Sequence, residues 1–221
     1  MRFAINSRKV LPLALLLIGV LSFSQTRPDA MSNFRTGRDL EAQGRSGEAE
    51  NYYREAVRIC FNEINEKTAT IETYVALTAT LMRQQKYADV ITWGEQGLKT
   101  RNDYRIVETM GEAHFYLGNY PASLRFMQRY VDALPEGDRS AVAYFFIGET
   151  YRMQKKFRHA DIAYTTALKL QPTLALWWYQ LGRVREAAGE TVPARTAYEQ
   201  ALKINPNYAQ ATEALARIGQ G

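Results

Sequence analysis

The chain has 221 residues, of which 46% are hydrophobic and 23% charged, a composition that excludes general disorder and collagen-like structure. A single cysteine, Cys60, excludes an internal disulfide and any zinc or iron–sulfur site built from several cysteines. The 28 basic and 23 acidic residues give a formal net charge of +5, whose meaning depends on where along the chain the charges lie.

Residues 1–24 have the composition of a secretory signal peptide. They contain Arg2, Arg8 and Lys9 without any acidic residue, followed by an apolar stretch of about 13 residues and small residues at its end. We expect cleavage after Ser24 and export to the periplasm or cell envelope. The alternative is a membrane anchor formed by residues 10–23, although a membrane-spanning helix usually needs roughly 18 or more apolar residues.

The mature chain is close to electrical neutrality. Three of the 28 basic residues lie in the leader, so 25 remain against 23 acidic residues, a net charge of about +2. A charge of this size produces no long-range field that would concentrate nucleic acid near the protein. We therefore expect no nucleic-acid partner.

The segment that follows the leader has helical periodicity. Apolar residues recur at i, i+3, i+4, i+7, i+8 and i+11, which is one helical stripe, at Tyr53, Ala56, Val57, Cys60, Phe61 and Ile64. This stripe predicts a helix that runs a turn or two further than its counterparts later in the chain. It also predicts that Cys60 is buried rather than paired with a cysteine of another chain.

A repeat with a period of 34 residues organises the rest of the chain. Separations of 37 and 34 residues occur both among Gly111, Gly148 and Gly182 and among Pro135, Pro172 and Pro206. Residues 25–221 therefore form one repeat domain, with units at residues 30–63, 71–103, 104–137, 141–174 and 175–208 and a terminal helix at 209–219. The insertion at 136–138 is polar and contains glycine, which predicts a loop.

The last two units resemble the tetratricopeptide repeat family. Unit four carries the family's spaced pattern at Tyr144, Ile147, Gly148, Tyr151, Ala160, Tyr164, Ala167 and Pro172. Unit five carries it at Trp178, Leu181, Gly182, Ala194, Tyr198, Ala201 and Pro206. One position departs from the pattern, because Arg185 stands where the family usually has an aromatic residue. The three upstream units keep the register with fewer matching residues.

The resemblance implies an all-α fold, a right-handed solenoid of about five antiparallel helix pairs closed by a capping helix. One pair of helices cannot bury its apolar face alone, so stacked pairs share a continuous core. Small residues such as Gly148 and Ala160 let the two helices of a unit approach closely. Proline ends the second helix because it lacks the N–H that would prolong it. We expect eleven helices and no strands.

No motif in the sequence indicates an enzyme. The chain contains no GxxxxGK[ST] phosphate-binding loop and no HExxH, GxSxG or paired CxxC sequence. His114 falls in a position that the repeat assigns to an aromatic core residue, and His159 falls in a short basic turn. We therefore expect a protein without catalytic activity, cofactor or bound metal.

The resemblance also implies where a partner binds. In this family the first helices of successive units line a concave groove, and the matching positions here are Phe34, Arg38, Arg105, Glu108, Glu112, Phe115, Phe145, Glu149, Arg152, Tyr179, Arg183 and Glu186. The glutamates predict an acidic centre that suits a basic or mixed-charge protein or peptide segment. The alternative is that the aromatic rings pack between units and the charges pair along the helices.

These features predict an exported scaffold or adaptor that acts in cell-envelope assembly or in forming a protein complex. Two alternatives remain open. One is self-assembly into a homo-oligomer, in which a second copy of the chain is the partner. The other is the binding of a small ligand or a cell-wall component in the groove. We expect contact with a membrane only if the leader is retained as an anchor.

Overall fold

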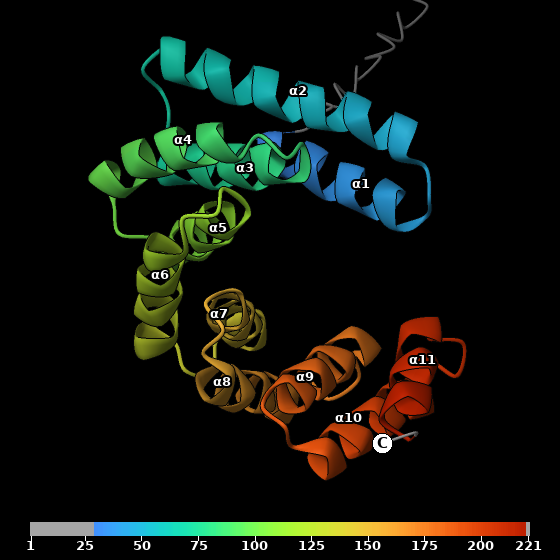
Figure 1. Ribbon diagram of the computed structural model, residues 1–221. Helices are drawn as coiled ribbons and strands as arrows, with labels where there is room; N and C mark the ends of the chain where they lie inside the picture. Colours follow the sequence, from blue (N-terminus) through green and yellow to red (C-terminus); the bar gives the residue numbers. More distant parts are fainter. Residues whose placement is uncertain (1–28, 220–221) are drawn as a thin grey trace, which may run out of the picture.

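The computed structural model describes residues 29–219, and within this range the chain forms eleven α-helices and no strand (Figure 1). The signal peptide predicted for residues 1–24 lies outside the described residues. The helices are α1 (Ala30–Ala42), α2 (Ser46–Asn65), α3 (Ile71–Arg83), α4 (Tyr87–Thr100), α5 (Tyr104–Tyr116), α6 (Tyr120–Ala133), α7 (Ser140–Met153), α8 (Phe157–Leu170), α9 (Ala175–Ala187), α10 (Thr191–Ile204) and α11 (Ala209–Ile218).

Successive helices form antiparallel pairs that follow one another along a curved stack (Figure 1). The first helices of the five units (α1, α3, α5, α7 and α9) and the terminal helix α11 face the inner side of the curve. The second helices (α2, α4, α6, α8 and α10) form its outer side. This arrangement confirms the predicted all-α solenoid of five helix pairs with a capping helix.

The two helices of a unit approach closely where a glycine on the first helix faces a tyrosine on the second. A Cβ atom added to Gly148 would lie 2.7 Å from Cδ1 of Tyr164, a distance that real side chains do not reach. The same pairing, 16 residues apart in each case, recurs at Gly37–Tyr53 and Gly182–Tyr198. The glycines are therefore required by packing and not by backbone conformation.

Unit two has a glycine on its second helix, where it makes an equally close contact with the following unit. Thr78 of α3 occupies the position that holds glycine elsewhere, and Gly94 of α4 occupies the position that holds tyrosine. A Cβ atom on Gly94 would lie 2.6 Å from the sulfur of Met110, which belongs to α5 of the next unit. The sequence pattern is altered in this unit, but a small residue still allows a close crossing of helices.

The long helix predicted for unit one is confirmed. Helix α2 has 20 residues, whereas the other described helices have at most 14. Cys60 lies in its apolar stripe and is completely buried, with Sγ 3.4 Å from the carbonyl oxygen of Thr73. Burial raises the pKa of the Cys60 thiol to about 12, so the thiol stays protonated at neutral pH. The predicted loop at 136–138 joins α6 to α7.

The turn inside each unit has the same backbone conformation throughout the stack. The residue two positions after the first helix has a positive φ, and three units place glycine there, at Gly44, Gly118 and Gly189. In units two and four the position is held by Gln85 (φ 58°) and Lys155 (φ 57°). Residues with a Cβ atom are strained in this left-handed conformation, so these two turns store backbone strain that the glycine turns avoid.

Candidate functional site

The four predicted aromatic residues lie on inner helices and are partly buried against other rings. Phe145 of α7 stacks on Trp177 of the next unit with ring centroids 4.9 Å apart. Phe34 and Tyr179 each lie against the tyrosine of the second helix of their own unit. Phe115 meets a phenylalanine of α7 edge-on, with centroids 5.3 Å apart. These rings hold helices together and so contribute to the core as well as to the inner face.

The central glutamates are held by an arginine that the sequence analysis did not select. Arg139 lies just before α7, and its Nη2 donates to Oε1 of Glu108 at 2.7 Å and also to Glu112. The side chains of Glu108 and Glu112 are 5% and 12% exposed. Burial, and the neighbouring carboxylate of Glu108, raise the pKa of Glu112 well above its usual value. Two buried carboxylates therefore share one guanidinium group, and Glu112 keeps its proton to a higher pH than a free glutamate.

Glu149 joins the two helices of unit four. Its Oε2 accepts a hydrogen bond from Nη2 of Arg152 at 2.6 Å, and its Oε1 accepts one from the hydroxyl of Tyr164 on α8. Burial and the adjacent carboxylate raise the pKa of the Tyr164 hydroxyl, so tyrosine remains the donor. The predicted pair of Glu149 and Arg152 is thus a structural contact at the inner face.

Arg105 and Glu186 connect neighbouring parts of the stack. Arg105 Nη2 lies 2.7 Å from Oε1 of Glu72 in unit two, and Arg105 Nε donates to Asp103 at 3.0 Å. Glu186 accepts from Arg217 of the capping helix α11 at 2.8 Å. These inter-unit ion pairs fix the spacing of successive inner helices.

Arg38 and Arg183 remain exposed at the two ends of the inner face. Arg38 pairs at 3.0 Å with its neighbour Asp39, and both side chains are about half exposed or more (49% and 62%). The guanidinium carbon of Arg183 lies 5.8 Å from the centre of the Tyr179 ring. Most of the twelve predicted residues therefore make contacts within the stack, and Arg38 and Arg183 are exposed cations at its two ends.

The exposed aromatic ring at the centre belongs to Tyr116, which the sequence analysis did not select. Tyr116 is the last residue of α5 and is 51% exposed, although it stacks on Tyr87 with centroids 4.9 Å apart. It lies one helical turn after Glu112, on the same side of α5. Burial raises the pKa of Tyr116, and so do the nearby carboxylates of Glu112 and Glu149. The ring of Phe146 meets that of Tyr116 edge-on. We call Tyr116, Tyr87, Glu112, Glu149 and Phe146 the central aromatic site.

The two histidines each lie against an aromatic ring. His114 stacks on Phe126 with centroids 5.3 Å apart, and its buried Nδ1 has no hydrogen-bond partner. Burial lowers the pKa of His114, as does the nearby charge of Arg125. His159 is exposed beside Tyr151. Among residues 29–219, no three His, Cys, Asp or Glu side chains are grouped to hold a metal ion.

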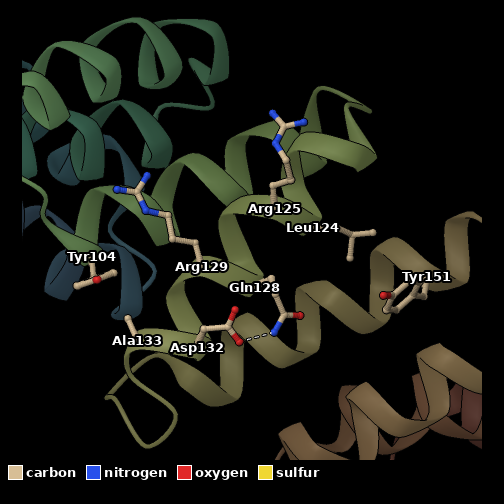
Figure 2. A pocket seen from close by; sticks show the side chains of 8 residues that line it. All are labelled: Tyr104, Leu124, Arg125, Gln128, Arg129, Asp132, Ala133 and Tyr151. Atoms are coloured by element: carbon tan, nitrogen blue, oxygen red, sulfur yellow. Dashed lines mark hydrogen bonds between the residues drawn. The ribbon is translucent and has the colours of Figure 1, made fainter.

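Two surface cavities lie away from the twelve predicted residues. The first, of about 800 Å³, runs along α6 (Figure 2). The second, of about 280 Å³, lies beside α8 and α9 and contains the pair formed by Asp161 Oδ1 and Arg185 Nε at 2.6 Å. Arg185, the departure from the repeat pattern, therefore has a carboxylate partner in the preceding unit. Within the described range no helix is long and apolar enough to cross a bilayer.

Comparison with known protein families identifies the repeat type of the last two units. Models described as "Tetratricopeptide repeat" match residues 141–174 and residues 175–218. These units are tetratricopeptide repeats. The other units share their helix-pair architecture in the same continuous stack, so the chain folds as a superhelix of this repeat type. Repeats of this type generally act as scaffolds without catalytic residues of their own.

Two curated relatives match parts of the chain. The tetratricopeptide repeat domain-containing protein PYG7, chloroplastic, of Arabidopsis thaliana is 30% identical over 89 residues, 40% of this chain and 30% of that protein. The protein O-mannosyl-transferase TMTC1 of Mus musculus is 28% identical over 147 residues, 65% of this chain and 15% of that protein. The chain thus spans less than a third of the length of either relative.

Solved structures with the same architecture cover most of the described chain. In the APC/C hetero-tetramer Cut9–Hcn1 the matched chain is 17% identical, with a TM-score of 0.70 over 85% of this chain and 36% of that one. MamA of Desulfovibrio magneticus RS-1 is 18% identical, with a TM-score of 0.60 over 81% and 96%. YrrB is 16% identical, with a TM-score of 0.58 over 86% and 93%. At these identities the similarity concerns the fold.

Proposed function

We propose that the protein is an exported, non-enzymatic scaffold that holds a segment of another protein against the inner face of its helical stack. It would act in cell-envelope assembly or in forming a protein complex. The observation that carries this proposal is the half-exposed ring of Tyr116 at the centre of the inner face, beside the carboxylates of Glu112 and Glu149. Rigid aromatic side chains of this kind are frequent anchors in protein interfaces.

The central aromatic site favours a basic side chain of the partner. A lysine or arginine can place its cation over the exposed face of Tyr116, which attracts positive charge. The surrounding charges do not oppose this, because both nearby arginines are already paired with glutamates, Arg139 with Glu108 and Glu112 and Arg152 with Glu149. A basic residue with apolar neighbours is therefore the chemistry that this face fits best.

The predicted glutamates support this site chiefly by fixing its geometry. Glu108 and Glu112 tie α5 to the start of α7 through Arg139, and Glu149 ties α7 to α8. A surface held in this way loses little conformational freedom when a partner binds. Reversal of the charge of Glu108 or Glu149 would therefore disturb the fold, so Tyr116 is the better position for testing binding.

Two of the similar structures give further support by analogy. YrrB is described as a repeat protein of this type with an unusual peptide-binding site, and Cut9 occurs in a hetero-tetramer with Hcn1. The same fold hosts many functions, so these examples support protein binding in general and no particular partner.

Binding can be tested with selected peptides. Random twelve-residue peptides would be selected against the immobilised protein, labelled with a fluorophore and titrated with wild type, Tyr116→Ala and Ile162→Ala while anisotropy is followed. Ile162 is the matched control because it is an apolar residue, 66% exposed, on the second helix α8. We expect Tyr116→Ala to weaken binding by about tenfold or more, the usual effect of losing an anchor residue. Unchanged binding by Tyr116→Ala, or equal loss by Ile162→Ala, would remove the assignment.

Export rests on the sequence of residues 1–24 and has its own test. The protein would be expressed with its natural leader and the N-terminus of the accumulated form sequenced. We expect that form to begin at Gln25, after cleavage following Ser24. A form that retains the leader and remains with the membrane fraction would instead support the anchored alternative.

A further inference from the structure

A second surface lies on the outer side of the stack, along α6. The cavity of about 800 Å³ there is open to solvent, with Tyr104 of α5 at one end and Tyr151 of α7 at the other (Figure 2). Arg125 and Arg129 stand on successive turns of α6 between them and project in the same direction (Figure 2). We call this surface the outer groove. Most of its lining belongs to α6, an outer helix of the stack, whereas Tyr116 belongs to α5, an inner helix (Figure 1).

The two arginines of the outer groove lack carboxylate partners, unlike Arg139 and Arg152 of the inner face. Arg125 forms no ion pair or hydrogen bond within the described residues, and Arg129 donates to the side-chain oxygen of Asn102. The carboxylate that lines the groove, Asp132, accepts instead from Nε2 of Gln128 at 2.7 Å. Two exposed guanidinium groups are therefore available to a ligand.

Positive charge continues at the far end of the outer groove. Nζ of Lys156 lies 6.0 Å from the centre of the Tyr151 ring, and the exposed side chain of His159 lies against the same ring. The groove thus offers two arginines, the apolar side chain of Leu124 and a ring at each end, with Lys156 as a third cation beside the ring of Tyr151. This is the complement of an acidic segment with apolar side chains between its carboxylates.

We propose that the outer groove binds an acidic segment of a protein partner in extended conformation. Arg125 and Arg129 are four residues apart on one helix, an axial rise of about 6 Å. Carboxylates two residues apart in an extended chain point to the same side and lie roughly 6.6 Å apart. An acidic residue at every second position therefore places one carboxylate on each guanidinium group, which can accept it in two parallel hydrogen bonds.

The chemistry of the outer groove favours such a segment over a nucleic acid. The carboxylate of Asp132, three residues beyond Arg129, would repel a phosphate backbone, which carries a charge at every step, whereas a short alternating segment can place an apolar residue beside it. The net charge of about +2 that remains after the predicted leader is removed adds no long-range attraction. A short acidic peptide needs only the local guanidinium groups.

The test uses two labelled peptides of equal composition, with three aspartates and three leucines between capped termini. In one the aspartates alternate with the leucines, and in the other they are contiguous. Anisotropy would be measured for both at low salt, with a labelled twelve-nucleotide single strand as a third probe. We expect the alternating peptide to bind at least five-fold more tightly than the contiguous one, and both to bind more tightly than the oligonucleotide.

The variants separate this surface from the rest of the protein. Arg125→Glu with Arg129→Glu should weaken binding of the alternating peptide at least tenfold. The control pair Arg35→Glu with Lys203→Glu makes the same change in net charge at exposed positions on α1 and α10 and should leave binding unchanged. If the charge reversal does not fold, as judged by circular dichroism, Arg125→Gln with Arg129→Gln replaces it.

Three results would overturn the proposal. They are equal binding by the arginine variant and wild type, equal affinity for the alternating and contiguous peptides, and tighter binding of the oligonucleotide. Tyr116→Ala should leave the binding of the alternating peptide intact. The proposal for the outer groove can therefore be confirmed or overturned independently of the function proposed for the inner face.

Discussion

Units two and five each have a glycine at a close crossing of helices, but the glycine meets different partners. In unit five Gly182 of the first helix receives the ring of Tyr198 from the second helix, as the family pattern prescribes. In unit two the glycine is Gly94 on the second helix, and it receives Met110 from the following unit. A glycine therefore permits close packing both within a unit, between α9 and α10, and between successive units, between α4 and α5.

The two crossings also differ in the stiffness of the side chain that fills them. A tyrosine ring is rigid and is fixed at both ends in unit five, because the hydroxyl of Tyr198 donates to Glu186 at 2.6 Å. Met110 is unbranched and can adopt other rotamers when its surroundings change. Units of similar geometry should for this reason respond differently to the same substitution.

The largest predicted effect comes from adding one methyl group at each crossing. We expect Gly182→Ala to lower the free energy of unfolding by about 2 kcal/mol, because the new Cβ overlaps the fixed ring of Tyr198. Gly94→Ala should cost less than about 1 kcal/mol, because Met110 can move and alanine favours the helix. Urea denaturation followed by circular dichroism measures both. Equal losses in the two variants would show that the stiffness of the neighbour does not decide the cost.

The ion pairs of units two and three provide a second comparison, because Glu72 and Glu112 contribute to the stability of the fold with opposite dependence on pH. Hydrogen bonding to Arg105 lowers the pKa of Glu72, so its stabilising contribution is present above its unfolded pKa and is lost as the pH falls. Burial raises the pKa of Glu112, so its contribution is full at acidic pH and is lost as the pH rises through the folded value.

Glutamine substitutions should reveal these opposite slopes. We expect Glu72→Gln to be destabilising near pH 7, by less than about 1 kcal/mol because the pair is exposed, and close to wild type near pH 4. Glu112→Gln should gain stability relative to wild type as the pH rises above about 4.3, the ordinary value for glutamate. Thermal melts between pH 4 and pH 8 test this, with the exposed Glu213→Gln as a control. The same slope for Glu72→Gln and Glu112→Gln would contradict the assignment of their charges.

The smallest predicted effect concerns the turns of units four and five. Lys155→Gly should stabilise the protein by roughly 0.5 kcal/mol, because glycine relieves the left-handed strain but loses more entropy on folding. Gly189→Ala should destabilise it by about 1 kcal/mol through the same backbone effect, since no atom lies within 4 Å of the added Cβ. Paired thermal melts of both variants measure the difference. If Gly189→Ala raised the melting temperature, this left-handed conformation would carry no strain for a residue with a Cβ atom.

The fold was predictable because its signals are local and repeated. The spacing of Gly148, Tyr164 and Pro172 predicts two helices, their close contact and the end of the second one, and the stripe through Cys60 predicts the long α2. Even where unit two has Thr78 and Gly94 at the positions of the glycine and tyrosine, the helical periodicity on each side keeps the register. Local pattern and global fold agree along the described chain.

The site was predictable only in outline, because its key contacts join different units. Arg139 precedes an inner helix, next to the inserted loop, at a position outside the repeat pattern, yet its side chain reaches back to Glu108 and Glu112. Tyr116 also lies beyond the positions taken from the resemblance. Its spacing of four residues from Glu112 was the available signal, since residues so spaced share one helix face. The pairing of the central glutamates, by contrast, depends on the distance between units.

The most direct test of binding at the inner face is site-specific cross-linking. A photoreactive benzoylphenylalanine would replace Tyr116 in one sample and Ile162 in another, and each would be irradiated with the selected peptide. Mass spectrometry would then locate the cross-linked residues. The account predicts strong cross-linking from position 116, removed by excess unlabelled peptide, and none from position 162. Equal cross-linking from both positions, or cross-linking from position 162 alone, would contradict it.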